Sequence, residues 1–385
     1  MNIKNILYSN FLYGLAILTL SLSVFRLSDY SFSLANFIII YLFIYYLKLI
    51  NKYVIFIYFI TISYLLLIAL YFFQELDILE FIKSFFLTSI MIFVFMSSLS
   101  IPIISMKFNL NKIISIIGVL IVSFEMIQVF ENILLGSSST WFLLDSVSIS
   151  TATDISRFQA MNLLSYMRPI SFYHEPSYLG IVLLILLICA NELKVKKIFI
   201  YIYYLGILVS FSTTALAFLI LYLIFKNFNS IKNILIVVFI LLILLIFFVG
   251  NNTLDTMFRI SEIFISGTSG NQRLIGPYEF LFKEIIEKHY YFGIPLGQSD
   301  IILDNSFYLI FLYFGILTPI LYILFISFIF YRFKSDAFKY LIAFFSLLFL
   351  NGAIFTLEAT LILYCLNYTF VTKRINLPIN KVICI

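Results

Sequence analysis

The feature that most constrains this chain is a series of nearly uninterrupted apolar runs of membrane-spanning length. Three of the clearest are residues 54–73, 85–104 and 231–249. Each is close to the ~20 residues that an α-helix needs to cross the hydrocarbon core of a bilayer. A backbone surrounded by lipid finds no water to bond with and has to be helical. The runs therefore predict an all-α polytopic membrane protein.

The composition supports this interpretation. Charged residues make up 11% of the 385 residues and hydrophobic residues 63%, whereas a soluble domain is about 25% charged. Lys4 precedes a long apolar run that lacks a small-residue cleavage site, so we expect a retained first span and not a signal peptide. Cys189 and Cys365 fall in apparent spans and Cys384 lies near the end of the chain, a pattern that gives no sign of a disulfide.

Basic residues cluster in short turns between the apolar runs. These clusters are Lys48/Lys52, Lys107/Lys112, Lys194/Lys196/Lys197, Lys226/Lys232, Arg332/Lys334/Lys339 and Lys373/Arg374/Lys381. The excess of Lys and Arg in cytoplasmic loops of membrane proteins places all of these clusters in the cytoplasm, together with both termini. We expect a multi-pass protein of the bacterial inner (cytoplasmic) membrane.

Alternating sides between these clusters predicts the spans. Single spans are expected near 5–25, 33–48, 54–73, 84–105, 113–130, 177–190, 233–249 and 306–330. Two more stretches, 198–225 and 340–371, have basic residues at both ends, so each has to cross and return. Their turns are expected near Ser212–Thr214 and 351–358, with arms that are short for a full span. The prediction is about 12 transmembrane helices, with 11 and 13 as alternatives.

The polar part of the chain lies in two large extracytoplasmic loops, 131–176 and 250–304, within a single integral membrane domain that covers residues 1–385. The cytoplasmic turns are short, and the chain has neither GxxxxGK[ST] nor GxGxxG. These features disfavour an ATP-driven pump and an enzyme that uses cytosolic nucleotide sugars. They also give no reason to expect nucleic acid as a partner.

Four arginines lie in these loops, on the side of the membrane where basic residues are unusual: Arg157, Arg168, Arg259 and Arg273. The planar guanidinium is well suited to bind phosphate through two parallel hydrogen bonds. An alternative interpretation is that they are solvated loop charges paired with nearby acids. Taken as a set, they predict a site for a phosphate or an anionic sugar.

The most specific string runs from Arg168 to Gly180, Arg-Pro-Ile-Ser-Phe-Tyr-His-Glu-Pro-Ser-Tyr-Leu-Gly. Pro176 suits the first turn of a helix. Glu175 would then lie at the positive end of the dipole of a span, at the boundary with external water. The string thus brings a carboxylate, the imidazole of His174 and a guanidinium to one place. The alternative is a carboxylate that only caps the helix.

Several strings together resemble the O-antigen polymerases of the Wzy type and the related O-antigen ligases. They are 168–180, Leu208-Val-Ser-Phe-Ser-Thr-Thr-Ala215, Arg273, Ile294-Pro-Leu-Gly297, Asn305-Ser-Phe-Tyr-Leu309 and Phe314-Gly-Ile316. The resemblance covers about residues 160–330. This chain has Asp304-Asn305 where members often have His-Asn, and Ser-Thr-Thr replaces Ser-Arg-Gly in the hairpin. The resemblance implies a fold similar to GT-C-type glycosyltransferases.

The second loop contains an expected amphipathic helix, residues 277–292. Apolar residues line one side, charged residues pair at i,i+4 on the other, and Gly293 ends the helix. Such a helix suits the membrane surface. The alternative for His289, which lies on it, is a lid helix without a catalytic residue.

The resemblance implies a glycosyltransferase that polymerises polyprenyl-pyrophosphate-linked oligosaccharide repeat units into O-antigen or a related surface polysaccharide. Arg168 and Arg273 would stabilise the departing pyrophosphate. Glu175 is the first candidate for the general base and His174 the second. The remaining candidates, for substrate binding, are Arg157, Tyr173, Arg259, His289 and Asn305. Two histidines and no suitable cysteine spacing give no reason to expect a metal or other cofactor.

Membrane lipid is an expected partner, and a chain-length regulator and a flippase are candidate partners. Two alternatives stay open, an O-antigen ligase and a transporter or flippase for saccharide units. Transporters usually carry ionisable residues at mid-membrane. Here the apparent spans contain only Glu125 and Glu358, both near an outer end. This favours chemistry at the surface.

Overall fold

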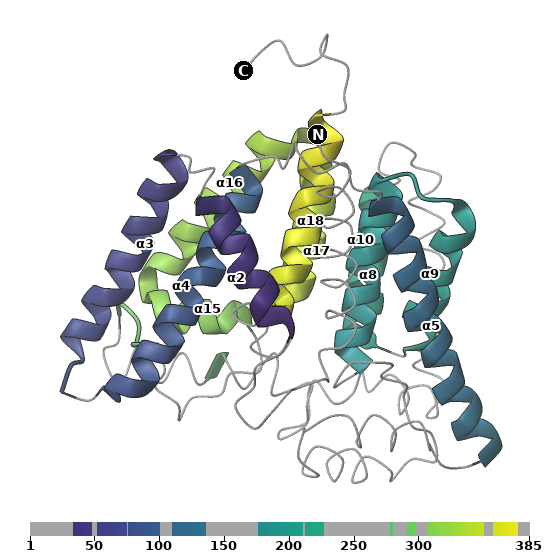
Figure 1. The fold of residues 1–385 in the computed structure, drawn as a ribbon, viewed down its shortest axis with the longest axis horizontal. Coiled ribbons are helices and arrows are strands. Elements are labelled where there is room, and N and C mark those ends of the chain that lie inside the picture. The colour runs from purple at the N-terminus through teal and green to yellow at the C-terminus, as the bar shows by residue number, and fades with distance from the viewer. Residues whose placement is uncertain are drawn as a thin grey trace. The chain divides into compact units, whose positions relative to one another are not determined.

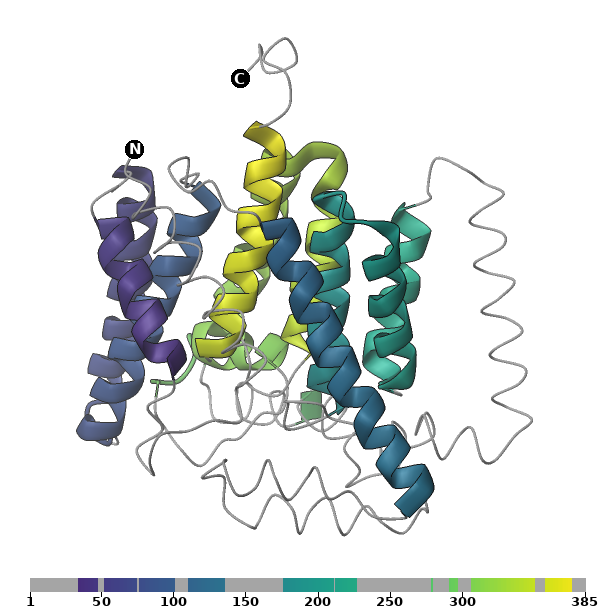
Figure 2. The same cartoon turned by 45° about the vertical axis from the view of Figure 1, so that its right-hand side comes forward.

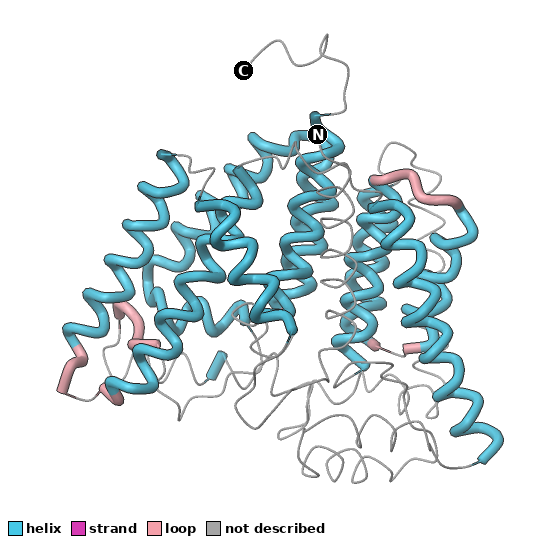
Figure 3. Tube along the Cα trace, in the orientation of Figure 1, coloured by secondary structure: helices cyan, strands magenta, loops and turns pink. Residues whose placement is uncertain are grey.

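The computed structural model describes residues 34–47, 52–74, 76–100, 110–135, 176–210, 212–226, 278–279, 291–296, 306–349 and 357–375. These residues form helices and loops and include no strand (Figure 3). The all-α prediction is therefore confirmed for this part of the chain. Four of its helical stretches are long and apolar enough to cross a membrane: Lys52–Tyr71, Ile78–Ser100, Asn111–Glu131 and Ser306–Leu348.

Two expected spans, 5–25 and 233–249, lie outside the described residues, so the count of twelve stays a prediction. The chain divides into two compact units. The first contains α5 (Leu110–Leu135), α8 (Pro176–Glu192), α9 (Lys197–Val209) and α10 (Thr213–Lys226). The second contains most of α2 (Leu34–Leu47), then α3 (Lys52–Tyr71), α4 (Ile78–Ser100), α15 (Ser306–Phe314), α16 (Thr318–Phe333), α17 (Ala337–Leu348) and α18 (Leu357–Ile375).

Helix α8 forms the core of the first unit. It packs against α5, α9 and α10, which run alongside it (Figures 1 and 2). Every residue from Leu179 to Ala190 is buried. A helix that is enclosed on all sides needs apolar residues around its whole circumference. The sequence of α8 meets this need, since Leu, Ile and Val dominate it.

The first expected hairpin is present in this unit. Helix α9 ends at Val209 and α10 begins at Thr213, which is the predicted turn. Lys226 Nζ donates a 2.8 Å hydrogen bond to Asn191 Oδ1, so the end of α10 lies beside the end of α8. The chain thus returns to the lysine-bearing end. At 13 and 14 residues, α9 and α10 are about 20 Å long. Both are shorter than a hydrocarbon core of about 30 Å.

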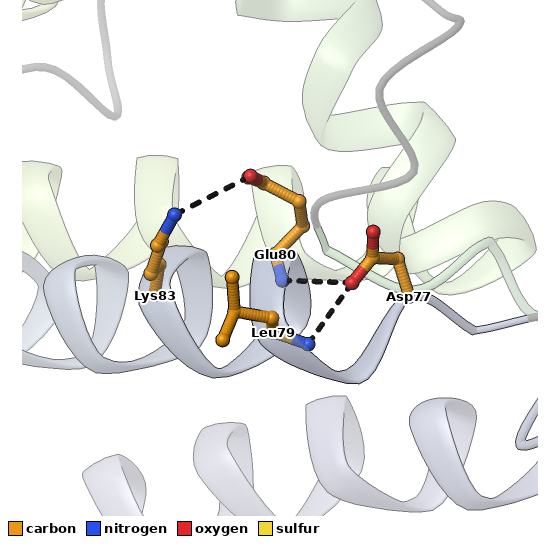
Figure 4. A network of polar contacts seen from close by, with 4 residues as sticks. All are labelled: Asp77, Leu79, Glu80 and Lys83. Carbon is orange, nitrogen blue, oxygen red and sulfur yellow. Dashed lines mark hydrogen bonds and ion pairs between the residues drawn. The ribbon is translucent and has the colours of Figure 1, made fainter.

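In the second unit, a short turn joins α3 to α4. Asp77 Oδ1 accepts hydrogen bonds from the backbone N–H groups of Leu79 (3.0 Å) and Glu80 (3.2 Å), as Figure 4 shows. These are first-turn donors of α4 that have no partner inside the helix. One turn further on, Lys83 Nζ lies 3.5 Å from Glu80 Oε1 on the exposed surface. Asp77 therefore fixes where α4 starts.

The second expected hairpin, α17 and α18, is also present. Asp336 precedes α17, and its two oxygens accept from Lys339 (3.0 Å) and from Lys373 near the end of α18 (2.5 Å). Burial alone would raise the pKa of the Asp336 carboxyl, but hydrogen bonds from the two lysines outweigh burial and lower it. Both ends of the hairpin therefore meet at one basic cluster, as the charge pattern predicts.

A buried chain of polar groups joins this hairpin to α4. Tyr340 Oη donates to Asn367 Oδ1 (2.5 Å), and Asn367 Nδ2 donates to Ser98 Oγ (2.7 Å). Ser98 Oγ in turn donates to the carbonyl of Phe95 (2.7 Å). All three side chains are buried, so satisfied hydrogen bonds are required there. This series of hydrogen bonds fixes α17 and α18 against α4.

The expected span 306–330 is not one helix. It breaks at Gly315, which has φ +52°, and Pro319 lies in the first turn of α16. Phe307 stacks on Tyr322 with ring centroids 5.0 Å apart, whereas residues 15 positions apart in one helix are separated by about 22 Å. Helix α15 thus folds back against α16 and does not continue its line (Figure 1). The apolar pattern alone did not reveal the break, because both pieces are apolar.

Candidate functional site

The nine predicted site residues lie outside the described part of the chain. They are Arg157, Arg168, Tyr173, His174, Glu175, Arg259, Arg273, His289 and Asn305. Of the expected helix 277–292, the structure describes Tyr278 and Glu279, which are helical, and a turn at Tyr291 and Phe292. It does describe two junctions where the helices adjoin the predicted loops, and both involve strings that the sequence singled out.

The first junction joins the start of α8 to the α9–α10 hairpin. A Cβ placed on Gly180 would lie 2.7 Å from Cβ of Ala215, 2.9 Å from Oγ of Ser210 and 2.9 Å from Cβ of Ser212. The absence of a side chain at Gly180 is therefore what allows this packing. The strings 168–180 and 208–215, separate in the sequence, thus contact each other.

Serine side chains shape the turn of this hairpin. Ser212 Oγ accepts a hydrogen bond from the backbone N–H of Ala215 (3.2 Å) and so caps α10. Ser210 Oγ donates to the carbonyl of Ile207 (2.8 Å), one of the last carbonyls of α9. Both serines are buried. The small polar residues of the turn thus satisfy the ends of both helices beside Gly180.

Between α5 and α9 the packing is equally close. Tyr203 Oη donates to the carbonyl of Ile114 (2.6 Å), and its ring lies over Gly118. Further along, a Cβ on Gly206 would lie 3.0 Å from Oε2 of Glu125. Two glycines therefore bring α9 onto α5.

Glu125 is completely buried at this interface, and neither carboxylate oxygen has a hydrogen-bond partner among the described residues. An acid inside a span is costly and is commonly functional. The sequence showed Glu125 as one of two acids within apparent spans, but it gave no reason to include it among the site residues. Its burial against Gly206 could not be read from the one-dimensional pattern.

The second junction joins the end of the second predicted loop to the break between α15 and α16. The backbone N–H of Ile294 donates to the carbonyl of Leu312 (2.9 Å), and that of Ile316 donates to the carbonyl of Tyr291 (2.8 Å). Gly293 has φ +100°, and a Cβ there would collide with the carbonyl of Tyr313. Here the segments 291–294 and 312–316, which overlap the strings 294–297 and 314–316, contact each other through their backbones.

Gly315 makes the reciprocal approach. A Cβ on this residue would collide with the carbonyl of Tyr291 and lie 2.7 Å from the backbone nitrogen of Gly293. Its positive φ is also one that glycine adopts without strain. The two glycines therefore let the two backbones meet directly.

Helix α3 supports this second junction. Tyr64 Oη lies 2.5 Å from the carbonyl oxygen of Phe292 and 3.3 Å from that of Phe314, and its ring stacks on Phe314 with centroids 5.6 Å apart. The junction is closed by an apolar cluster whose buried members are Leu65, Ala69, Phe81, Leu296 and Phe314. The loop end is thus packed against α3 and α4.

The described residues contain no group of three or more His, Cys, Asp or Glu side chains placed to hold a metal ion. What they provide is a pair of structural supports, one at the start of α8 and one at the break between α15 and α16. Each adjoins a segment that carries predicted site residues, since Glu175 directly precedes α8, and Leu296 at the second support directly precedes residues 297–305, which end at Asn305.

The family model for WcaD colanic acid polymerase matches residues 8–374, which is nearly the whole chain. No curated protein and no solved structure matches the sequence.

Proposed function

Because the chain belongs to the WcaD colanic acid polymerase family, we propose that it joins polyprenyl-pyrophosphate-linked repeat units at the extracytoplasmic face of the inner membrane. Family membership establishes the broader activity, a membrane-embedded polymerase of polysaccharide repeat units with glycosyltransferase-type chemistry. It also confirms the resemblance to the Wzy-type polymerases that the sequence strings indicated.

The proposed donor follows from the predicted location. Nucleotide sugars are cytosolic, so a transferase that works outside the cytoplasm needs a sugar carried by a membrane lipid. The predicted loops carry the arginines, and arginine suits a pyrophosphate. The full-length family match is the observation that carries the proposal. Support also comes from the two junctions, which join the loop-flanking strings to the membrane helices.

In the proposed reaction, Glu175 takes the proton of an acceptor sugar hydroxyl, with His174 as the second candidate. The freed oxygen forms a bond to the anomeric carbon of the donor sugar. The bond between that carbon and the pyrophosphate oxygen breaks, and the polyprenyl pyrophosphate leaves. Arg168 and Arg273 stabilise the charge that develops on it. No metal ion takes part.

The other predicted residues bind the saccharide or its carrier. Arg157 and Arg259 contact the phosphate or acidic sugars, and Tyr173, His289 and Asn305 contact sugar hydroxyls. A flippase that delivers the repeat units and a regulator of chain length are the proposed partners. Both termini of the polymerase lie in the cytoplasm.

A deletion strain tests the proposed function. A polymerase joins repeat units, so the strain should still export one unit and attach it to its final carrier. A ligase deletion would instead leave long polymer on the lipid carrier, and a flippase deletion would leave single units on the cytoplasmic face. A gel of surface polysaccharide without a single-repeat band would contradict the proposal.

Site variants test the proposed roles. Arg168→Ala, Arg273→Ala and Glu175→Gln should abolish transfer while the protein inserts at normal levels. Lysine at either arginine position should rescue poorly, because it keeps the charge and loses the planar fork. Lys83→Ala is the matched control, since Lys83 is an exposed cation paired only at the surface. Activity near wild type for Glu175→Gln would reduce Glu175 to a helix cap.

A further inference from the structure

By the length and composition of helix α3, the second junction belongs at membrane depth. Helix α3 is one of the stretches long and apolar enough to span a bilayer, and Tyr64 is seven residues from its end at Tyr71. That distance is about 10 Å along a helix, and the other end at Lys52 is about 18 Å away. Whichever end faces outward, the carbonyls of Phe292 and Phe314 that Tyr64 contacts belong inside the span.

Irregular backbone at this depth is unusual, because a lipid environment leaves its polar groups without partners. Here the partners are built into the protein. Gly293 to Leu296 are buried, Pro295 has no N–H to satisfy, and Ile294 bonds to Leu312. The hydroxyl of Tyr64 donates to the carbonyl of Phe292 at 2.5 Å. Hydrogen bonds therefore fix this segment, in addition to the packing that buries it.

The second junction adjoins the segments that carry two predicted site residues. Tyr291 is the second residue after His289, and residues 297–305, which end at Asn305, separate Leu296 from α15. The protein backbone is therefore anchored two residues after His289. It is also anchored on both sides of the segment 297–305, which contains Asn305. A shift of the anchor would displace the chain on which both residues lie.

We propose that Tyr64 is a positioning residue for the transfer reaction, which fixes the end of the second loop at the break between α15 and α16. This rests on the proposed function. Tyr64 does not contact substrate. Its hydroxyl binds the carbonyl of Phe292, its ring stacks on Phe314, and it thereby fixes the distance between the loop end and α3.

Tyr64→Phe is the variant that tests this role, because it removes the hydroxyl and keeps the stacked ring. Tyr71→Phe is the matched control on the same helix, since Tyr71 is 83% exposed. The first measurement is independent of activity. Leu296→Cys, in a background without the three native cysteines, reports junction opening by its rate of maleimide labelling. Loss of one hydrogen bond predicts labelling about fivefold faster in Tyr64→Phe, the factor that corresponds to about 1 kcal/mol.

The second measurement is the rate of polymerisation per folded molecule, with lipid-linked repeat units purified from the deletion strain. We expect kcat/KM to fall about fivefold or more in Tyr64→Phe, while its melting temperature falls by no more than a few degrees and Tyr71→Phe behaves as wild type. Unchanged labelling would overturn the proposal, as would faster labelling with an unchanged rate per folded molecule. Both of these outcomes leave the proposed function standing. A wild type that does not polymerise the units refutes the proposed function, and the positioning role with it.

Discussion

Replacing Gly180 by alanine tests the first junction, and two effects of opposite sign decide the result. In the interior of a helix, alanine is favoured over glycine by about 1 kcal/mol. The new Cβ would lie 2.7–2.9 Å from three atoms. Two of them are Cβ atoms tied to the backbone of Ser212 and Ala215, so a rotamer change cannot relieve the contact.

The hairpin therefore has to move away from α8 by about 0.7 Å before the closest contact, at 2.7 Å, reaches an ordinary 3.4 Å. Overpacking of this kind costs about 1–3 kcal/mol. We expect the free energy of unfolding to fall by about 1 kcal/mol. We also expect α8 to be displaced at Gly180, which is five residues after Glu175. Fluorescence-detected size-exclusion chromatography after heating should show a melting temperature lower by a few degrees. Polymer formation should fall as well.

The second substitution Ala215→Gly provides the matched control. It removes the atom that the new Cβ would meet at 2.7 Å, so the double variant should recover part of the loss despite the lower helix propensity of glycine. A single variant Gly180→Ala that is as stable as wild type, or more stable, would show that the hairpin does not rest on Gly180. It would then refute the reasoning about this junction.

Three further predictions concern the rest of the chain. Asn367→Leu should lower stability by about 1–3 kcal/mol, measured as a lower melting temperature. It removes the buried acceptor of the Tyr340 hydroxyl and the donor to Ser98 Oγ, and an unchanged melting temperature would show that these hydrogen bonds contribute nothing. The pKa of Asp336 is lowered, so its ion pairs stabilise the hairpin at neutral pH and lose this effect as the pH falls through that pKa. Asp336→Asn should therefore remove this part of the dependence of the melting temperature on acid pH. Reporter fusions after residues 150, 228, 280 and 385 should report outside, inside, outside and inside, and an external signal at 228 would contradict the orientation predicted for the first hairpin.

The sequence predicted the helices of this protein better than their interruptions. Basic residues at both ends of 198–225 and 340–371 required two hairpins, and the structure turns between Val209 and Thr213 and between Leu348 and Leu357. Charge could predict these turns because the location of lysine depends on topology. The break at Gly315 follows from a backbone contact with Tyr291, which is distant in sequence. No local pattern carries that information.

The candidate site shows the same contrast between what sequence patterns predict and what contacts distant in sequence determine. The strings that pointed to a polymerase did so by their order along the chain, and the family match confirms that class. What the strings do physically was not evident from their order. Gly180 and the serine turn form one contact, and Gly293 and Gly315 form another. Tyr64, which supports the second contact, belongs to none of the strings and lies more than 200 residues away from Phe292 in the sequence.

Both junctions are built in the same way, and this construction suits the proposed chemistry. In each, a glycine allows a close approach between elements next to a predicted loop. Hydrogen bonds to backbone groups shape the hairpin turn at the first junction and join the two segments directly at the second. A transferase that acts on two lipid-linked saccharides has to hold loop residues in a fixed geometry above membrane helices, since small misplacements of reacting groups cost large factors in rate. Anchoring the loops at their bases by backbone contacts achieves this without placing charged groups in lipid. The arginines and the carboxylate that we propose for the reaction can then remain in the predicted loops, where ionised side chains are hydrated.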